Sequence, residues 1–314
     1  MHVHLIAGAV LSLAMTLSGW AADYGAEVRK DTPLAWWRFQ EPTTADGDTV
    51  KDETGQHAGL YRGGVKHESG PPGIGGRAAR FDGQRAFIDV PHQAAFALDE
   101  LSVEVWVRAT QPWTAKQWPG SATLVSKATA GPGSSDWTIN AGTLQAGQNE
   151  GRILTSTGAA GSGADANLAS GQHLNDGHWH HVVWTRSSTG LNCLYVDGRL
   201  ADQAEDEGGP IANDRPIQIG GDPLERGTFL DGALAEPALY AGVLTADRVQ
   251  AHAVAGGLDV PLATPGAAAP TPPLESLALQ NSTGLTWELW RGADGWSLGQ
   301  IALHGKPLVR PQCV

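Results

Sequence analysis

Between Leu34 and Tyr240 the sequence is a succession of short apolar runs separated by turn residues. The clearest runs are LAWWRF (34–39), LSVEVWVRA (101–109), TLVSKA (123–128), DWTIN (136–140), RILTST (152–157), WHHVVWTR (179–186) and LNCLYV (191–196). In the second run Val103, Val105 and Val107 alternate with other residues, which is the period of two expected for a strand with one covered face. Short alternating runs bounded by turns predict an all-β fold.

Turn residues support the same prediction. The chain has 41 glycines and 19 prolines among 314 residues, and these residues dominate tight turns. The pair Asp197-Gly198, which follows LNCLYV, is the strongest two-residue hairpin signal in the chain. With 41% hydrophobic residues, the chain can bury a sizeable core in one large or two ordinary domains.

One helix is expected, in LTADRVQAHAVAGG (244–257). Thr245 is placed to cap its N-terminus, and Asp247 lies in the first turn, where a carboxylate complements the helix dipole. Gly256 and Gly257 form a stop signal. The helix therefore ends the β region.

The first 21 residues have the pattern of a secretory signal peptide. An apolar run from Leu5 to Leu17 leads into small residues, and we expect cleavage after Ala21. The run is short for a membrane span, and two histidines, with no Lys or Arg, precede it. The alternative is a buried N-terminal helix. We expect a secreted, extracellular or periplasmic protein.

The composition changes after the expected helix. Residues 258–274 are rich in Pro and Ala and poor in charge, as in an extended linker. Residues 275–314 contain three strand-like runs, too few to bury a core of their own. We therefore expect a sandwich domain over residues 22–257, a linker, and the start of an incomplete second β domain.

Acidic side chains outnumber basic ones by 33 to 21, which gives a formal charge of -12. This charge argues against nucleic acid as a partner, because it repels phosphates. The two cysteines, Cys193 and Cys313, are too few for a disulfide scaffold, although secretion would permit a bond between them. Because Cys193 lies in an alternating run, we interpret it as a small buried hydrophobe.

Nine segments in order resemble the laminin G-like domain of the concanavalin A-like lectin/glucanase superfamily. They are PLAWWRFQE, DETGQHAGLY, GRAARFDGQRAFIDVP, LSVEVWVRA, LVSK, LNDGHWHHVVWTR, LYVDGRL, IQIGGDP and FLDGALAEPALYAGVLTADRVQAH. The resemblance extends from about Asp31 to Gly257. It implies a jelly-roll sandwich of two antiparallel sheets that acts as a non-catalytic binding or adhesion module of extracellular bacterial proteins.

Some relatives in this superfamily are glycoside hydrolases with strand carboxylates spaced as E-x-D-x-x-E, a triplet that does not occur here. Glu104 has Trp106 in place of a second carboxylate, and we interpret it as a solvated or salt-bridged strand residue. No catalytic residue is assigned. We expect a binding module for an extracellular glycan or a surface protein. The alternative is the N-terminal part of an extracellular carbohydrate-active enzyme whose catalytic domain lies beyond residue 314.

The resemblance also implies a structural Ca²⁺ site on the outside of the sandwich. Laminin G-like domains often use an acidic residue near the start of the domain and another near its final strand, and Asp52 and Glu236 match those positions. Carboxylate and backbone oxygens are the ligands that calcium prefers. Ala235 departs from the pattern, because many relatives have Asp there. The alternative is that Asp52 caps a turn and Glu236 forms a surface ion pair.

Three histidines fall in LNDGHWHHVVWTR (174–186). A strand places His178 and His180 on one face and His181 on the other, so the three cannot bind one metal ion. His178 and His180 alone lack a third zinc ligand. We interpret all three as structural, with Trp179 in the core, His181 buried beside it, and His178 the most exposed.

The loop TQPWTAKQWPG (110–120) is the predicted ligand-binding site, because it connects two strands at the rim of the sandwich. Trp113 and Trp118 could stack on sugar rings, while Lys116 and Gln117 could form hydrogen bonds with hydroxyl groups. The alternative is that both indoles fold back over the end of the core.

Overall fold

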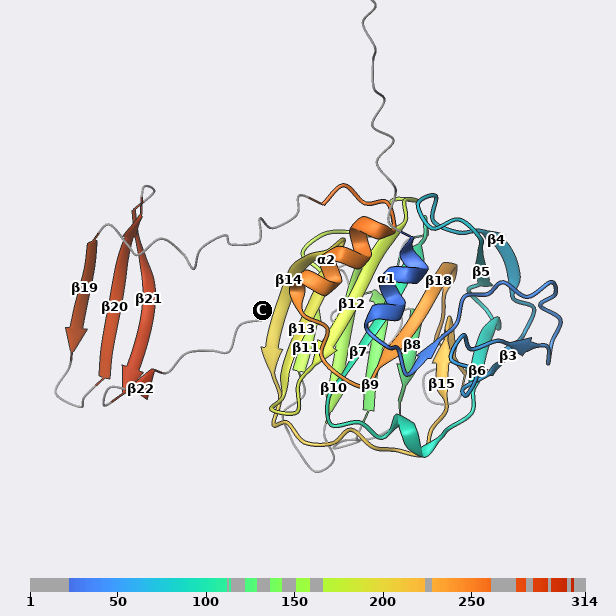
Figure 1. Cartoon of the computed structure of the whole chain (residues 1–314), viewed down its shortest axis with the longest axis horizontal. Helices are drawn as coiled ribbons and strands as arrows, with labels where there is room; N and C mark the ends of the chain where they lie inside the picture. The colour runs from blue at the N-terminus through green and yellow to red at the C-terminus, as the bar shows by residue number, and fades with distance from the viewer. Residues whose placement is uncertain are drawn as a thin grey trace, which may run out of the picture.

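The computed structural model describes residues 23–111, 113, 122–128, 136–142, 151–158, 166–223 and 228–260, and the backbone of four strands between residues 275 and 307. Two large antiparallel sheets lie face to face, which confirms the predicted all-β jelly-roll sandwich (Figure 1). One sheet carries two helices on its outer face, and we name it the helix-side sheet. We name the other the far sheet.

The helix-side sheet has eight strands. Their spatial order is β14 (Arg199–Glu205), β13 (Leu191–Val196), β12 (His180–Arg186), β7 (Leu101–Arg108), β18 (Asp231–Tyr240), β5 (Arg77–Asp82) and β4 (Lys66–Ser69), with β1 (Ala35–Trp36) paired to β18. A bulge interrupts the pairing of β18 with β7 between Ala235 and Ala238.

The far sheet also has eight strands. Their order is β11 (Ala166–Ala169), β10 (Arg152–Gly158), β9 (Asp136–Gly142), β8 (Ala122–Lys127), β15 (Ile217–Ile219), β6 (Phe87–Val90), β3 (Gly59–Arg62) and β2 (Thr49–Val50). The short strands β16 (Gly221–Asp222) and β17 (Thr228–Phe229) pair with each other, and a 3-10 turn covers Ala94–Phe96.

The main core fills the space between the two sheets. Val103, Val105 and Val107 of β7 all belong to it, as their alternation predicts. The ring centroids of Trp137 on β9 and Trp184 on β12 lie 6.0 Å apart across this core. Each fully buried side chain of this size contributes about 1.5–3 kcal/mol of transfer free energy.

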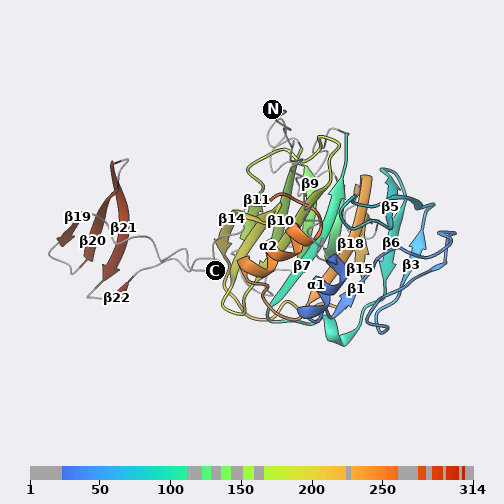
Figure 2. The ribbon, with the colours of Figure 1, turned by 45° about the horizontal axis from the view of Figure 1, so that its top comes forward.

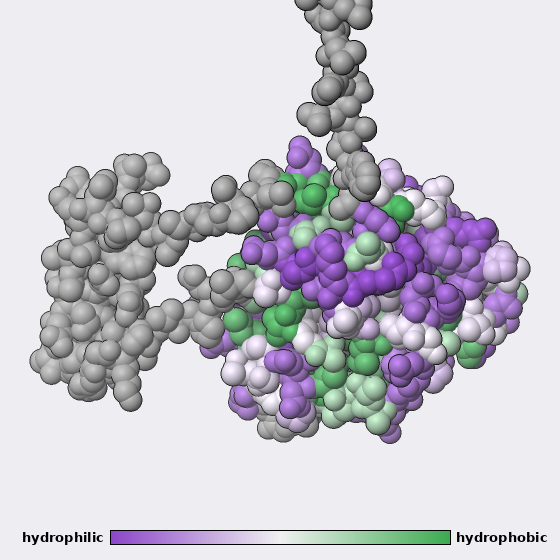
Figure 3. Space-filling view, viewed as in Figure 1, coloured by the Kyte–Doolittle hydropathy of each residue, from purple (hydrophilic) through white to green (hydrophobic). Residues whose placement is uncertain are grey.

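Two helices, α1 (Tyr24–Lys30) and α2 (Ala246–Ala255), cover the outer face of the helix-side sheet (Figure 2). Helix α2 confirms the prediction, because Thr245 caps it and it ends at Gly256. Helix α1 was not predicted; its cap is Asp23, which accepts a hydrogen bond from the Gly25 amide at 3.0 Å. The molecular surface over the two helices is mainly hydrophilic (Figure 3).

A second apolar cluster lies between the helices and the helix-side sheet. Its larger members are Tyr24, Val28, Trp36, Trp106, Val183, Tyr195, Tyr240 and Val249. Strand β7 is therefore covered on both faces rather than on one. Cys193 belongs to this cluster and is 2% exposed.

The predicted hairpin at Asp197-Gly198 is confirmed. The two residues connect β13 to β14 with φ angles of 51° and 75°, the left-handed values that a type I′ turn requires at both central positions. A β-carbon at Gly198 would lie 3.0 Å from the Ala253 side chain. Glycine at this position therefore lets the hairpin pack against α2.

The C-terminal strands form a sheet of their own among the described residues. It consists of β19 (Glu275–Gln280), β20 (Leu285–Gly292), β21 (Gly295–Leu303) and β22 (Lys306–Pro307). The predicted signal peptide and most of the predicted linker lie outside the described residues, so the predicted domain boundaries stay predictions. Within the part of the chain that the structure describes, no helix has the length and apolar character needed to cross a membrane.

Candidate functional site

The predicted ligand-binding loop is described only in part. Trp113 is 2% exposed and belongs to the main core, and its Nε1 atom has no hydrogen-bond partner among the described residues. This indole therefore covers the end of the core and offers no face to a sugar. Lys116, Gln117 and Trp118 lie outside the described residues.

Asp52 organises a turn. It is 1% exposed, and its Oδ1 atom accepts hydrogen bonds from the amides of Trp36 at 2.8 Å and Thr54 at 3.1 Å. Its Oδ2 atom accepts from the amides of Gln56 at 3.1 Å and His57 at 2.9 Å, and from the Thr54 hydroxyl. Burial raises the pKa of Asp52, but these hydrogen bonds outweigh it and the pKa is lowered.

Glu236 lies in the bulge of β18 and is 1% exposed. Its Oε2 atom accepts a hydrogen bond from the Trp36 indole Nε1 at 2.8 Å, and Nε of Arg38 lies 3.0 and 3.2 Å from Oε2 and Oε1. Burial raises the pKa of Glu236 to about 7, against the opposing effect of Arg38. The expected surface ion pair is therefore partly buried, with the carboxylate enclosed and the Arg38 side chain 24% exposed.

The donor sets of Asp52 and Glu236 do not fit a calcium ion. Calcium takes six to eight oxygen ligands, whereas N–H and O–H groups already occupy both Asp52 oxygens and an arginine lies against Glu236. Among the described residues, no three His, Cys, Asp or Glu side chains are grouped so as to hold a metal ion.

The histidines of LNDGHWHHVVWTR have structural partners. The side chain of His178 is 81% exposed, whereas His181 is fully buried, as predicted. His181 stacks on Trp106 with ring centroids 4.9 Å apart, and not on Trp179. Trp179 is half-buried and packs against the second apolar cluster, at its periphery rather than inside it. It lies at the end of the strand, with the Arg108 guanidinium 5.0 Å from its ring centroid.

His180 connects two turns. One ring nitrogen lies 2.8 Å from Asp197 Oδ2 and the other lies 3.1 Å from Asp176 Oδ1. Burial lowers the pKa of His180, but the two carboxylates outweigh it and raise the pKa. Both ring nitrogens of His180 are therefore occupied by the protein itself.

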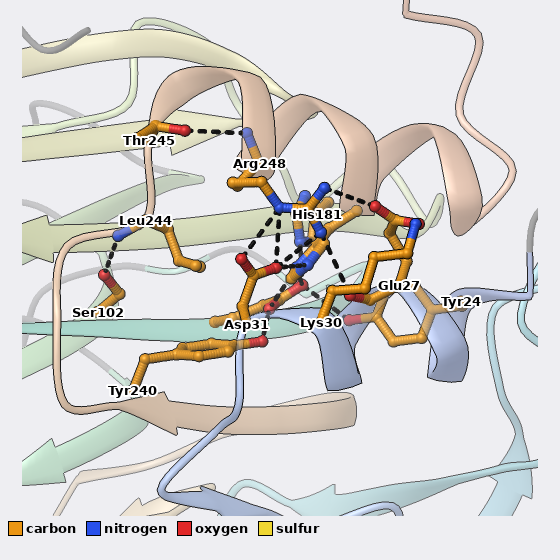
Figure 4. A network of polar contacts seen from close by, with 12 residues as sticks. Tyr24, Glu27, Lys30, Asp31, Ser102, His181, Tyr240, Leu244, Thr245 and Arg248 are labelled. Carbon is orange, nitrogen blue, oxygen red and sulfur yellow. Dashed lines mark hydrogen bonds and ion pairs between the residues drawn. The ribbon is translucent and has the colours of Figure 1, made fainter.

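Glu104 is the centre of a buried polar network. Figure 4 shows its partners Tyr24, His181 and Tyr240 between the helices and the sheet. The Glu104 carboxylate accepts hydrogen bonds from the hydroxyls of Tyr24 at 2.8 Å and Tyr240 at 2.6 Å. Nε2 of His181 lies 2.7 Å from Oε1, and Nδ1 of His252 lies 3.0 Å from Oε2. The interpretation of Glu104 as a solvated residue is wrong, because α1 and α2 cover this face of the sheet; the salt-bridged alternative is confirmed.

The network continues from Glu104 to the helices through His252. Nε2 of His252 lies 2.8 Å from Asp31, and Arg248 contacts Asp31 at 2.7 Å and Glu27 at 2.6 Å. Since carboxylates only accept, both nitrogens of His252 act as donors. Burial lowers the pKa of His252, but Glu104 and Asp31 outweigh it and raise the pKa to about 8.

The network stabilises the fold and does not form a catalytic centre. Burial raises the pKa of Glu104, but the charge of His252 and the hydrogen bonds from His181 and His252 hold it well below its ordinary value. Glu104, His181 and His252 are 0% exposed, so no substrate reaches them. They tie α1 and α2 to strands β7, β12 and β18.

A row of polar side chains crosses the outer face of the far sheet, and we name it the polar row. Its members are directly paired from strand to strand: Asn167 (β11), Ser156 (β10), Thr138 (β9), Ser126 (β8), Gln218 (β15) and Asp89 (β6). Directly paired residues share a face of the sheet. The neighbouring residues Ile139 and Ile219 point to the other face and belong to the main core.

Solvent reaches the polar row at its ends. Asn167 is exposed and Ser156 and Asp89 are half-buried, whereas Ser126, Thr138 and Gln218 are 1–3% exposed. Hydroxyl and amide groups both donate and accept hydrogen bonds, as hydroxyl-rich ligands require. The row is thus chemically suited to such a ligand.

An aromatic pair lies beside the polar row. Phe87 shares the outer face of β6 with Asp89, because the two residues are two positions apart. The ring centroids of Phe87 and Phe229 lie 6.4 Å apart, and both side chains are half-buried. A β-carbon on Gly221 would lie 2.5 Å from the Phe229 ring and 3.2 Å from the β-carbon of Phe87, so the Phe229 ring packs over this glycine. The sequence analysis did not single out this pair.

A groove of about 610 Å³ lies elsewhere, between the β13–β14 hairpin and the residues that follow α2. Arg199, Leu200 and Asp259 line it, and Leu200 is 46% exposed. Its described lining residues include no member of the polar row and no aromatic side chain. We therefore favour the polar row as the candidate site.

A model of the concanavalin A-like lectin/glucanase superfamily matches residues 82–250, more than half of the chain. The chain belongs to this superfamily. The match confirms the resemblance found in the nine sequence segments. A search of curated proteins found no match.

Solved structures of the superfamily fold are similar to this chain. Domain 4 of AbnA, a GH43 extracellular arabinanase from Geobacillus stearothermophilus in complex with arabinotriose, has a TM-score of 0.54 and 18% identity, and the match covers 70% of this chain and 98% of that domain. The binding domain of Paraclostridial Mosquitocidal Protein 1 has a TM-score of 0.55 and 14% identity, with 83% of this chain and 64% of that one covered.

The binding domain of botulinum neurotoxin DC in complex with SialylT has a TM-score of 0.51 and 14% identity, with 72% of this chain and 52% of that one covered. The chain thus covers less than two thirds of the two toxin domains. At these identities the likeness shows the superfamily fold alone. All three similar structures are domains of larger proteins or binding domains by their descriptions.

Proposed function

We propose that this protein is a secreted glycan-binding module that contacts a neutral polysaccharide through the polar row and the Phe87–Phe229 pair. The similar structures support a binding role, since one was solved with arabinotriose and another with SialylT. The signal-peptide pattern of residues 1–21 supports secretion. The formal charge of -12 favours an uncharged ligand over an acidic one.

The polar row carries this proposal. Strands in a sheet lie about 4.8 Å apart, so the solvent-accessible ends of the row, at Asn167 and at Asp89, are separated by roughly 24 Å, a distance that several sugar rings span. The accessible members Asn167, Ser156 and Asp89 offer hydrogen-bonding groups to sugar hydroxyls. An aromatic ring at the Asp89 end offers an apolar face to the C–H side of a sugar ring. Asp89 is the one row member with an ionisable side chain.

The loop at residues 110–120 is a further proposed contact at the rim. Trp118, Lys116 and Gln117 keep their proposed roles, whereas the buried Trp113 supports the loop from the core side. A ligand that follows the far sheet to its rim would combine the two sets of contacts.

A second candidate is the accessory domain of a larger enzyme. Domain 4 of AbnA, a part of an arabinanase, is covered to 98% by this chain. That likeness favours a protein in which this sandwich delivers a catalytic domain to its polysaccharide. The complete reading frame beyond residue 314 decides between the two.

The test is a binding screen. The purified protein is subjected to affinity electrophoresis in gels that contain arabinan, xylan, mixed-linkage glucan or pectin. We expect at least one neutral polysaccharide to retard it. Absence of retardation by every polysaccharide, for a protein shown to be folded by its melting curve, contradicts a glycan-binding function.

A further inference from the structure

Trp36, Asp52, Glu236 and Arg38 make one connected set of contacts, which we name the Trp36 clasp. Asp52 accepts the backbone amide of Trp36 at 2.8 Å and Glu236 accepts its indole N–H at 2.8 Å. The carbonyl of Trp36 accepts the amide of Glu53 at 2.8 Å. Strand β1 is thereby joined to the turn at residue 52 and to β18.

The backbone holds the Glu236 carboxylate toward the clasp. Glu236 has a φ of 55°, in the left-handed region, a strained conformation for a residue other than glycine that persists only where the surroundings enforce it. The bulge between Ala235 and Ala238 places it there. A carboxyl side chain is therefore held in a strained, buried position beside Trp36.

Arg38 supplies the positive charge that this position requires. Its Nε atom lies 3.0 Å from Oε2 of Glu236, and its guanidinium carbon lies 4.6 Å from the centroid of the Trp36 ring. The guanidinium is thus held by a carboxylate and by a cation–π contact with the same tryptophan. A buried carboxylate without such a partner is strongly destabilising.

We infer that Arg38 takes the place of a calcium ion in this protein, so that the Trp36 clasp joins β1 to β18 without metal. The two carboxylates that match the family's calcium positions are both engaged by N–H and O–H donors of the chain. A fixed guanidinium a few ångströms away repels a divalent cation. The inference concerns stability and is independent of the proposed glycan binding.

The first test needs no variant. The melting temperature of the protein is measured in EDTA and in 5 mM CaCl₂, and calcium binding is followed by calorimetry. We expect the same melting temperature in both and no binding heat. A ligand that binds only the folded state raises the melting temperature. A calcium-dependent rise that disappears in Glu236→Gln overturns the inference.

The second test is a double-mutant cycle of Arg38→Gln and Glu236→Gln. If Arg38 is the cation of the clasp, the double variant melts well above the temperature that the sum of the two single losses predicts, because no unpaired buried charge remains. Additive losses overturn the inference. Arg62→Gln is the matched control, since Arg62 lies 3.9 Å from an exposed aspartate, and we expect little change.

Discussion

The Nδ1 atom of His252 lies 3.0 Å from the Oε2 atom of Glu104, and both side chains are completely buried. The two residues come from helix α2 and strand β7, so this ion pair fixes the helix to the sheet. Tyr24, which donates a hydrogen bond to Glu104, lies on helix α1. Asp31, which contacts His252, directly follows that helix. Helix α1 is therefore a structural part of the sandwich domain.

We predict that stability falls as the pH rises from about 6.5 to about 8. The pKa of His252 is raised to about 8 in the folded protein, above its unfolded value of about 6.5, so its contribution is complete below 6.5 and is lost through this range. The contribution is about 2 kcal/mol. The measurement is the free energy of unfolding in guanidinium chloride between pH 5.5 and 9.

The control for this prediction is His252→Gln, in which the loss of stability between pH 6.5 and 8 should be smaller than in the parent. Glu104 has the opposite effect on the pH dependence of stability, at acidic pH. Its folded pKa is lowered, so its contribution is present above the unfolded value of about 4.3 and is lost as the pH falls through the folded value. A parent whose stability is flat from pH 6.5 to 8 would contradict the charged state of His252.

We predict that Glu104→Gln lowers the free energy of unfolding by about 3–5 kcal/mol, because it leaves the charge of His252 without its buried partner. Denaturant unfolding measures the loss. Glu205→Gln, at the exposed end of β14, is the matched control and should change stability by less than about 0.5 kcal/mol. Equal effects of the two changes would show that the network adds no stability.

We predict that Tyr24→Phe lowers stability by about 1.5–3 kcal/mol, the range for a hydrogen bond to a charged group. Its hydroxyl donates to Glu104 at 2.8 Å and accepts from the Trp106 indole at 3.2 Å. The ring is retained, so the change tests the hydrogen bonds and not the packing. A variant as stable as the parent would show that the Tyr24 hydroxyl adds nothing to the attachment of α1.

The sequence was sufficient for features that depend on neighbouring residues. The alternation around Val103, the hairpin at Asp197-Gly198 and the cap at Thr245 are all local patterns, and the structure confirms each. The order along the chain of the nine segments that resemble the laminin G-like domain then predicted the sandwich. These signals work because strand period, turn geometry and helix capping are properties of short stretches of chain.

The sequence was not sufficient where partners are distant. Tyr24 and His252 lie 80 and 148 positions from Glu104, so nothing near Glu104 indicated that two helices would cover it. The polar row was missed for the same reason. Nothing in the sequence around Ser126 or Gln218 indicates that the two lie side by side; the pairing of β8 with β15 aligns them.

Residue type alone left the role of two positions open. Trp113 is a large aromatic residue in a polar loop. Such a residue can bind a ligand or can cover the end of the core, and the burial of Trp113 favours the second role. Glu236 matches a family calcium position, but Arg38 and Trp36 occupy its carboxylate. In both cases the neighbours in space, and not the residue itself, determine the role.

The most direct measurement is calorimetric titration of the retarding polysaccharide, cut to oligosaccharides, into the parent, a Ser156→Ala, Asn167→Ala double variant and a Phe87→Ala variant. His178→Ala, at an exposed turn outside the polar row, is the control. Hydrogen bonds to an uncharged ligand contribute about 0.5–1.5 kcal/mol each, so we predict about tenfold weaker binding by the double variant and unchanged binding by the control. Parent-like affinity in both the double variant and Phe87→Ala, with melting temperatures intact, would contradict the assignment of the polar row as the binding site.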